Sequence, residues 1–203
     1  MEQYATDNDD ERNPHYPSWD VNCANYVSQS LVAGGGLEPI SGVWDVSPRI
    51  EVKWGWVKWV YKSMAGGLRV FGANVYYNDE TSNDYSVGVS NTWNNANAQF
   101  EYFSNSRNGY MNGEVIEINQ NTNMEALLKK YNIQIGDIMY WGDDNHKGHA
   151  TIISLVTDAD IMYAGNTMAR FDSSLSEAIE GQTVYIIRIN DEKYNQTNDY
   201  RME

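Results

Sequence analysis

Cysteine is almost absent from this chain: Cys23 is the single one among 203 residues. One cysteine cannot form an intrachain disulfide, so oxidative cross-links add nothing to the stability of the fold. Apolar runs are short, and none approaches the roughly 18 residues that a membrane-spanning helix requires. These absences exclude a disulfide-stapled scaffold, and they predict a protein without a membrane partner.

Basic residues are also scarce, with 14 Lys and Arg against 28 Asp and Glu and a formal net charge of −14. Such a chain repels phosphate backbones and anionic lipid, so we predict no nucleic-acid partner. An apolar share of 41% and an aromatic share of 13% are typical of a globular protein. The length suits one domain over residues 1–203, and we expect a monomer.

The segment 23–33 has the pattern of an amphipathic helix. Apolar residues recur at helical spacing along one face: Ala24, Val27 and Leu31. Asp20 or Asn22 can cap the start of this helix, and the glycine run 34–36 ends it. The lone cysteine therefore stands at the first position of the first predicted helix.

The remaining segments indicate an α+β fold. Helices are expected over 54–64 and 123–131, whereas 72–113 is rich in Asn, Tyr, Ser and Gly and suggests loops with short strands, such as a hairpin insertion over the core. Short apolar runs rich in β-branched residues predict antiparallel strands over 137–141, 150–157, 160–164 and 183–189. We expect the helix of Cys23 to pack on this sheet.

Cysteine chemistry requires the thiolate, and an ordinary thiol with a pKa of about 8.5 is mostly protonated at neutral pH. At a helix N-terminus the unpaired N–H groups and the macrodipole favour an anion, so we expect the pKa of Cys23 to be lowered. The same N–H groups can hold the oxyanion of an acyl-transfer intermediate. The alternative is a buried structural cysteine without reactivity.

A base is the next requirement, and the chain has three histidines. His149 stands at the start of a predicted strand, where a side chain is held rigidly and can still face a cleft. His146 lies in an acidic loop and is expected to be exposed, and His15 closely precedes the helix of Cys23. We therefore predict His149 as the base.

A third group should orient the imidazole. If the turn between two strands centres on Asp158-Ala159, Met168 lies opposite His149, and Asn166 lies diagonal to it at roughly 7–8 Å on the same face. A slip of one residue would turn Asn166 to the other face. Asn166 is the predicted orienting residue, with Asp172 as a weaker candidate.

Several stretches of the sequence together resemble the bacterial putative amidase domain family, within the papain-like cysteine peptidase superfamily that includes NlpC- and CHAP-type cell-wall hydrolases. The similar stretches are Asn13-Pro14-His15-Tyr16-Pro17, Cys23-Ala24-Asn25-Tyr26-Val27-Ser28-Gln29, Trp54-Gly55-Trp56-Val57, Ile135-Gly136-Asp137-Ile138-Met139-Tyr140-Trp141, Gly148-His149-Ala150-Thr151-Ile152-Ile153, Asn166-Thr167 and Tyr185-Ile186-Ile187-Arg188-Ile189. The resemblance implies a papain-like fold and a thiol-dependent amidase without a cofactor. It places the nucleophile, the base and the third residue on Cys23, His149 and Asn166.

One departure concerns the residue before the nucleophile, because the family usually carries Asp there and this chain has Asn22. Asp20, Asn22 and Trp19 are the candidate oxyanion or substrate-binding residues. The relatives imply an amide or peptide substrate, with cell-wall peptidoglycan as the best candidate. Localisation stays open, although a secreted or cell-envelope protein of a bacterium is favoured if the sequence is part of a longer precursor.

Other functions were weighed against this one. A metal cluster could be formed by Asp143, Asp144, His146 and His149, but an acidic turn explains that spacing better, and we predict no metal. An inactive glycan- or peptidoglycan-binding module could use a stacking surface of Trp93, Tyr102 and Tyr110. A toxin-type domain could use the same nucleophile against a protein substrate.

Overall fold

The computed structural model describes residues 21–40, 43–45, 49–51, 74–77, 84–166 and 170–195. Its helices are α1 (Cys23–Ala33), α3 (Asn91–Asn94), α4 (Ala96–Ser104), the 3-10 turn η3 (Ser106–Asn108), α5 (Met124–Lys130), α6 (Leu175–Ala178) and α7 (Asp191–Asn195). Its strands are β1 (Arg49–Glu51), β2 (Asn74–Tyr77), β3 (Asp84–Val89), β4 (Ile116–Asn119), β5 (Ile138–Gly142), β6 (Lys147–Val156), β7 (Ile161–Gly165), β8 (Arg170–Ser174) and β9 (Thr183–Ile187).

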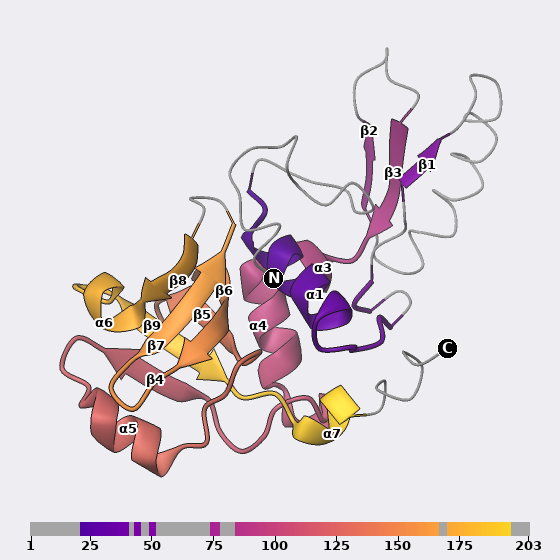
Figure 1. Cartoon of the computed structure of the whole chain (residues 1–203). Helices are drawn as coiled ribbons and strands as arrows, with labels where there is room; N and C mark the ends of the chain where they lie inside the picture. Colours follow the sequence, from indigo (N-terminus) through magenta and orange to yellow (C-terminus); the bar gives the residue numbers. More distant parts are fainter. Residues whose placement is uncertain are drawn as a thin grey trace.

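Six of these strands form one antiparallel sheet in the order β4-β9-β5-β6-β7-β8, and β1, β3 and β2 form a smaller one. Helices α1 and α4 pack beside β6 on one face of the large sheet (Figure 1). The expected α+β class, with an early helix on an antiparallel sheet, is confirmed.

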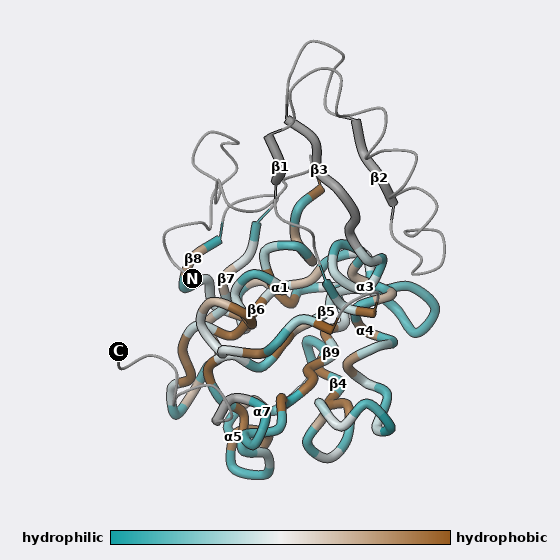
Figure 2. The backbone as a smooth tube through the Cα atoms, turned by 90° about the vertical axis from the view of Figure 1, so that its right-hand side faces the viewer, coloured by the Kyte–Doolittle hydropathy of each residue, from teal (hydrophilic) through white to brown (hydrophobic). Residues whose placement is uncertain are grey.

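The large sheet separates two apolar clusters because side chains alternate between its faces. Ala150 and Ile152 of β6 face α1 and share a cluster with Cys23. Thr151 lies between them in the strand, and Ile153 packs in the second cluster, together with residues of α5 and α6. The brown, apolar stretches of the chain follow these strands through the interior, and teal loops lie outside (Figure 2).

The predictions of local structure are mostly confirmed. Helix 23–33 has the predicted bounds, and α5, β5, β6, β7 and β9 fall within the predicted segments or a few residues from them. Two short strands, β4 and β8, were not predicted: β4 alternates buried and exposed residues but is only four residues long, and β8 is mostly exposed and polar. The helix expected over 54–64 lies outside the described residues.

The prediction of loops and short strands over 72–113 is wrong for its second half, where residues 91–104 form α3 and α4. Asn95, which suggested a turn, is the N-cap of α4 and accepts a hydrogen bond from the Ala98 N–H at 2.9 Å. Trp93 and Phe103 anchor this helical pair in the core, and both are fully buried.

The aromatic side chains proposed as a glycan-stacking surface also belong to this core. Trp93 lies 5.3 Å from Trp44, and Phe103 packs on Trp44 at the same centroid distance. Tyr110 is 6% exposed and packs edge-on against Phe103. A ring buried in this way has no free face for a sugar, so the predicted binding surface is wrong for Trp93 and Tyr110.

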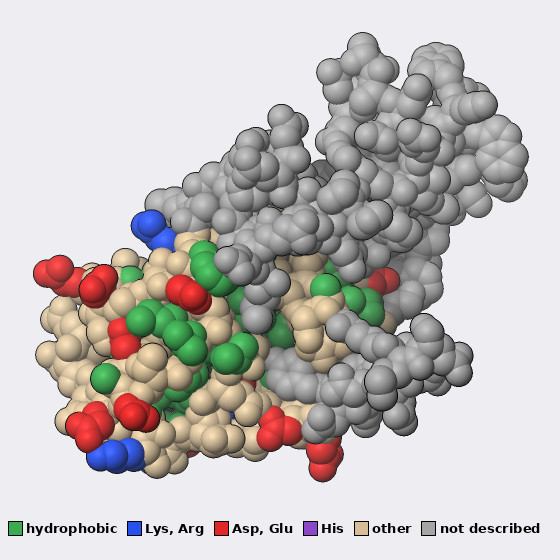
Figure 3. All heavy atoms as spheres, in the orientation of Figure 1, with side chains coloured by type: hydrophobic (Ala, Val, Ile, Leu, Met, Phe, Trp, Pro, Cys, Tyr) green, Lys and Arg blue, Asp and Glu red, His purple; other side chains and the backbone are tan. Residues whose placement is uncertain are grey.

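The described surface carries dispersed charge. Acidic side chains are spread over the described part of the face in Figure 3 and do not form one continuous patch. None of the described helices is long and apolar enough to cross a membrane.

Candidate active site

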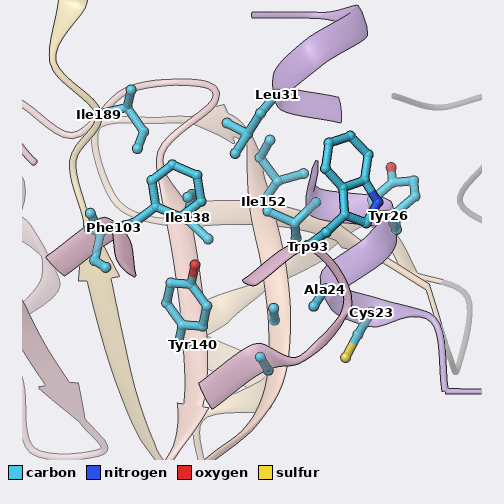
Figure 4. Packing of buried hydrophobic residues seen from close by; sticks show 14 of the residues in the cluster. Cys23, Ala24, Tyr26, Leu31, Trp93, Phe103, Ile138, Tyr140, Ile152 and Ile189 are labelled. Atoms are coloured by element: carbon cyan, nitrogen blue, oxygen red, sulfur yellow. The ribbon is translucent and has the colours of Figure 1, made fainter. Parts of the chain in front are cut away.

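Cys23 is the first residue of α1 and is 3% exposed. Asn22 occupies the N-cap, but its side chain makes no capping bond to the described backbone of α1. Backbone N–H groups of Ala150 and Ala24 instead face the Cys23 sulfur and favour its anion. In Figure 4 the sulfur lies at the margin of the apolar cluster and points away from the ring of Trp93.

Burial raises the pKa of the Cys23 thiol above its ordinary value, and the backbone donors from Ala150, Ala24 and Cys23 offset only part of this rise. The expected lowering of the pKa by the helix N-terminus is therefore wrong for the resting protein. A sulfur removed from water loses the solvation that stabilises its anion, and N–H dipoles compensate only partly. Cys23 rests as a neutral thiol at pH 7.

His149 is the third residue of β6 and is half-buried. It lies directly opposite Trp141 of β5. Burial lowers the pKa of its imidazole below the ordinary value, because the low dielectric disfavours the cation. At pH 7 His149 is neutral and can accept a proton.

Ala150, which follows His149 in β6, relates the position of Cys23 to that of His149. Among the described residues the β6–β7 ladder ends at the pair Ile152–Ala164, two residues short of Ala150. Strand N–H groups lie in the plane of the sheet, so the Ala150 N–H can bond the Cys23 sulfur where β7 no longer pairs with β6. The sulfur consequently lies beside the backbone of the residue that follows His149.

The end of β7 lies against the imidazole. A Cβ built on Gly165, the last residue of β7, would lie 3.8 Å from His149 Nε2 and 2.8 Å from Thr151 Cγ2. Only a residue without a side chain fits at this spacing, so Gly165 allows β7 to approach His149. Asn166 follows directly and is 1% exposed. His149 and Asn166 thus lie at the end of β7, and the Cys23 sulfur lies beside Ala150, the next residue along β6.

The register near Asn166 differs from the prediction. Next to the turn the strands pair as expected, with Val156 opposite Ile161, but an irregularity between Ile153 and Leu155 shifts the ladder by one residue. Asn166 is therefore not diagonal to His149 on its face, and the predicted register is wrong at this end. Gly165 is the residue of β7 that lies next to the His149 imidazole, and Asn166 lies in the turn after β7.

The other candidates have different outcomes. Trp19 and Asp20, like His15, lie outside the described residues. Asn22 is buried, and its Oδ1 accepts a hydrogen bond from the side chain of Asn25. Asp172 accepts a hydrogen bond from Ser154 Oγ at 2.6 Å, five residues along β6 from His149, so it does not orient the imidazole.

The acidic loop before β6 forms a turn. Asp143 accepts hydrogen bonds from the backbone N–H groups of Asn145 and His146, which lowers the pKa of its carboxyl group. Asp144 accepts a hydrogen bond from the Tyr185 hydroxyl at 2.6 Å. The described residues contain no group of three or more His, Cys, Asp or Glu side chains arranged to hold a metal ion.

Sequence reasoning missed two contributors to the site, the Ala150 N–H and Gly165. A backbone N–H has no signature in a sequence, because every residue except proline carries one. Gly165 stands in the run Ala164-Gly165-Asn166-Thr167. A glycine at the end of a strand can indicate that another group approaches closely, so the sequence did contain a signal for the role of Gly165.

A comparison with protein families assigns the chain to one of them. The model of the family described as "Putative amidase domain" matches residues 1–187, and the chain belongs to that family. Membership suggests a hydrolase that cleaves amide bonds. No curated protein and no solved structure matched the chain.

Proposed function

We propose that this protein is a thiol-dependent amidase of papain-like arrangement, with Cys23 as nucleophile and His149 as base and acid. The observation that carries the proposal is the hydrogen bond from the Ala150 N–H to the Cys23 sulfur, since it ties the thiol to the neighbour of His149. The family description independently suggests amide hydrolysis. Together they favour a nucleophile over an inert structural cysteine.

The proposal adds one contact, between His149 Nδ1 and the Cys23 thiol. Nε2 lies next to Gly165 at the end of β7, which leaves Nδ1 for the proton transfer. Nδ1 is the ring nitrogen nearer the backbone, and the sulfur lies beside the next residue along that backbone. By strand alternation His149 leaves β6 on the face opposite Ala150. The imidazole therefore reaches the sulfur past the free edge of β6, where β7 has ended.

The directions of the two pKa shifts favour one form of this mechanism. A neutral thiol and a neutral imidazole, once in contact, react by general-base attack without a resting ion pair. His149 takes the thiol proton as the Cys23 sulfur attacks the amide carbonyl carbon, and the carbonyl oxygen becomes an oxyanion. When the intermediate collapses, the C–N bond breaks, the amine takes the proton from His149, and an acyl thioester remains on Cys23.

Water completes the cycle. His149, neutral again, takes a proton from a water molecule that attacks the thioester carbonyl. The C–S bond breaks, a carboxylic acid leaves, and the sulfur recovers a proton from His149. The N–H of Cys23 is the oxyanion donor in this scheme, because it belongs to the first turn of α1, whose N–H groups have no partner within the helix.

Asn166 is the proposed orienting residue for His149. Its support is position: it is buried and directly follows Gly165, whose Cβ position lies 3.8 Å from Nε2. A carboxamide oxygen that accepts from Nε2–H would hold the proton there and keep Nδ1 as the base. Asp20, Asn22 and Trp19 stay candidates for binding substrate, and a cell-wall peptide is the proposed substrate class.

The direct test is digestion of purified peptidoglycan, with a panel of simple peptide amides, followed by mass spectrometry. The wild-type protein should release a new amine and a new carboxylate, and rapid acid quenching should trap an acyl group on Cys23. Cys23→Ala and His149→Ala should each abolish release while the circular dichroism spectrum and melting temperature stay near wild type.

His146→Ala is the matched control, since this second histidine is exposed in the adjoining turn. It should retain full hydrolysis. Substantial hydrolysis by Cys23→Ala would overturn the assignment of the nucleophile, and equal losses in the two histidine variants would overturn that of the base.

A further inference from the structure

Three buried side chains form a line of hydrogen bonds that ends next to the nucleophile. Trp93 Nε1 of α3 donates to Asn25 Oδ1 at 2.6 Å, and Asn25 Nδ2 donates to Asn22 Oδ1 at 2.7 Å. Trp93 and Asn25 are fully buried, and Asn22 is 2% exposed. Figure 4 shows the Trp93 ring beside the first turns of α1.

The line has one direction because an indole N–H can only donate. Trp93 therefore requires the oxygen of the Asn25 carboxamide on its side. The NH₂ group of Asn25 must then face Asn22, which must present its own oxygen. One donor on α3 sets the orientation of both carboxamides.

This orientation matters because Asn22 directly precedes Cys23. An N-cap side chain ordinarily bonds the backbone N–H groups of the first helical turn. Here the Asn22 oxygen accepts from the Asn25 side chain and makes no cap bond to the first turn, and the N–H group of Ala24 faces the Cys23 sulfur instead. Asn25 thus diverts a cap that would compete for the donors at the reacting atom.

We propose that Asn25 and Trp93 are positioning residues, which hold Asn22 away from the first turn of α1 so that its backbone N–H groups stay directed at Cys23. The inference rests on the proposed function for its catalytic meaning. The hydrogen bonds themselves exist whatever the substrate is. Neither residue touches the reacting atoms in this scheme.

The effect on Cys23 can be measured without a substrate. Because the chain has one cysteine, the ultraviolet absorbance of the thiolate, corrected with Cys23→Ala, reports the titration of Cys23 alone. Trp93→Phe removes the donor and keeps an aromatic ring. We expect it to raise the pKa of Cys23 by up to one unit, which is an up to tenfold lower thiolate fraction and alkylation rate at a fixed pH below the pKa of the thiol.

A second background tests the route of this effect. In Asn22→Ala the diverted cap is absent, so Trp93→Phe should cause no further change in the Cys23 titration, although it still lowers the melting temperature. If Trp93→Phe folds poorly, Asn25→Leu, which is close in shape, takes its place in the same comparison. An equal shift in both backgrounds would overturn the inference, because Asn22 would then not transmit it.

Trp44→Phe is the matched control. Trp44 is also fully buried and packs 5.3 Å from Trp93, but its Nε1 donates to Ser28 Oγ at 3.0 Å and not to Asn25. It should lower the melting temperature by a similar amount and leave the Cys23 titration unchanged. If Trp44→Phe shifts the pKa of Cys23 as much as Trp93→Phe does, the effect comes from core packing and not from the hydrogen bonds through Asn25. If wild-type protein hydrolyses no amide while Trp93→Phe shifts the Cys23 titration as expected, the amidase scheme fails and the inference about Asn25 and Trp93 stands.

Discussion

The approach of β7 to His149 can be tested by giving Gly165 a side chain. In Gly165→Ala the new methyl group would lie 2.8 Å from Thr151 Cγ2, well inside an ordinary carbon–carbon contact. Thr151 cannot simply rotate away, because its hydroxyl accepts a hydrogen bond from Trp141 Nε1 at 3.0 Å. Thr151 is also fully buried, so β7 itself has to shift.

Overpacking of this kind costs about 1–3 kcal/mol. Rotation of Thr151 would leave the buried Trp141 N–H unpaired, which costs about 1–3 kcal/mol. Gly165→Ala is therefore destabilising whether β7 shifts or Thr151 rotates. Thr151→Ser removes the clashing methyl and retains the hydroxyl, and by itself costs roughly 1 kcal/mol of lost apolar burial. The double variant should therefore be more stable than the sum of the single losses predicts, by at least about 1 kcal/mol.

Urea unfolding followed by tryptophan fluorescence measures these free energies. The double variant should also retain hydrolysis, since the remaining methyl lies 3.8 Å from His149 Nε2, an ordinary contact. If Gly165→Ala leaves the free energy of unfolding unchanged, or if Thr151→Ser gives no rescue, β7 does not approach β6 as described. The reasoning that places Asn166 beside His149 would then fail with it.

Three further outcomes follow from the same structure. Ser28→Ala should lower the free energy of unfolding by about 1–3 kcal/mol, measured in urea, because the buried Trp44 indole loses its acceptor at 3.0 Å and Gln99 Nε2 keeps only its bonds to backbone oxygens; an unchanged free energy would contradict it. Burial raises the pKa of Asp137 to about 7, so the folded state binds the extra proton. The stability from this group is complete below about pH 4 and is lost as the pH rises to 7, by up to about 4 kcal/mol, and Asp137→Asn should abolish that dependence in urea titrations. For hydrolysis, kcat/KM should rise with pH at a value below 6.5, because burial lowers the pKa of His149. It should then stay high to above pH 9, because burial raises the pKa of Cys23. A bell-shaped pH profile centred below pH 6.5 would indicate a resting ion pair instead.

Much of the fold could be predicted from local sequence patterns. The helix 23–33 was predictable to the residue, because its apolar spacing and the glycine run after it are both local signals. The position of Cys23 at the head of that helix came from the same signals. The strands from β5 to β9, apart from β8, were visible as apolar runs because a buried strand needs such side chains wherever it lies. The proposal of His149 as the base rested on its position at the start of a strand, and the family resemblance pointed to the same residue.

Local sequence signals were therefore sufficient for helix 23–33, α5 and the long apolar strands, but not for α3, α4, β4 or β8. Tertiary structure alone decided how the elements meet: the irregularity between Ile153 and Leu155 that moves Asn166, and the end of β7 that leaves the Ala150 N–H to the sulfur. It also decided the direction of the Cys23 pKa shift. A helix N-terminus is a local property, but the burial that outweighs it depends on every chain segment packed around the thiol.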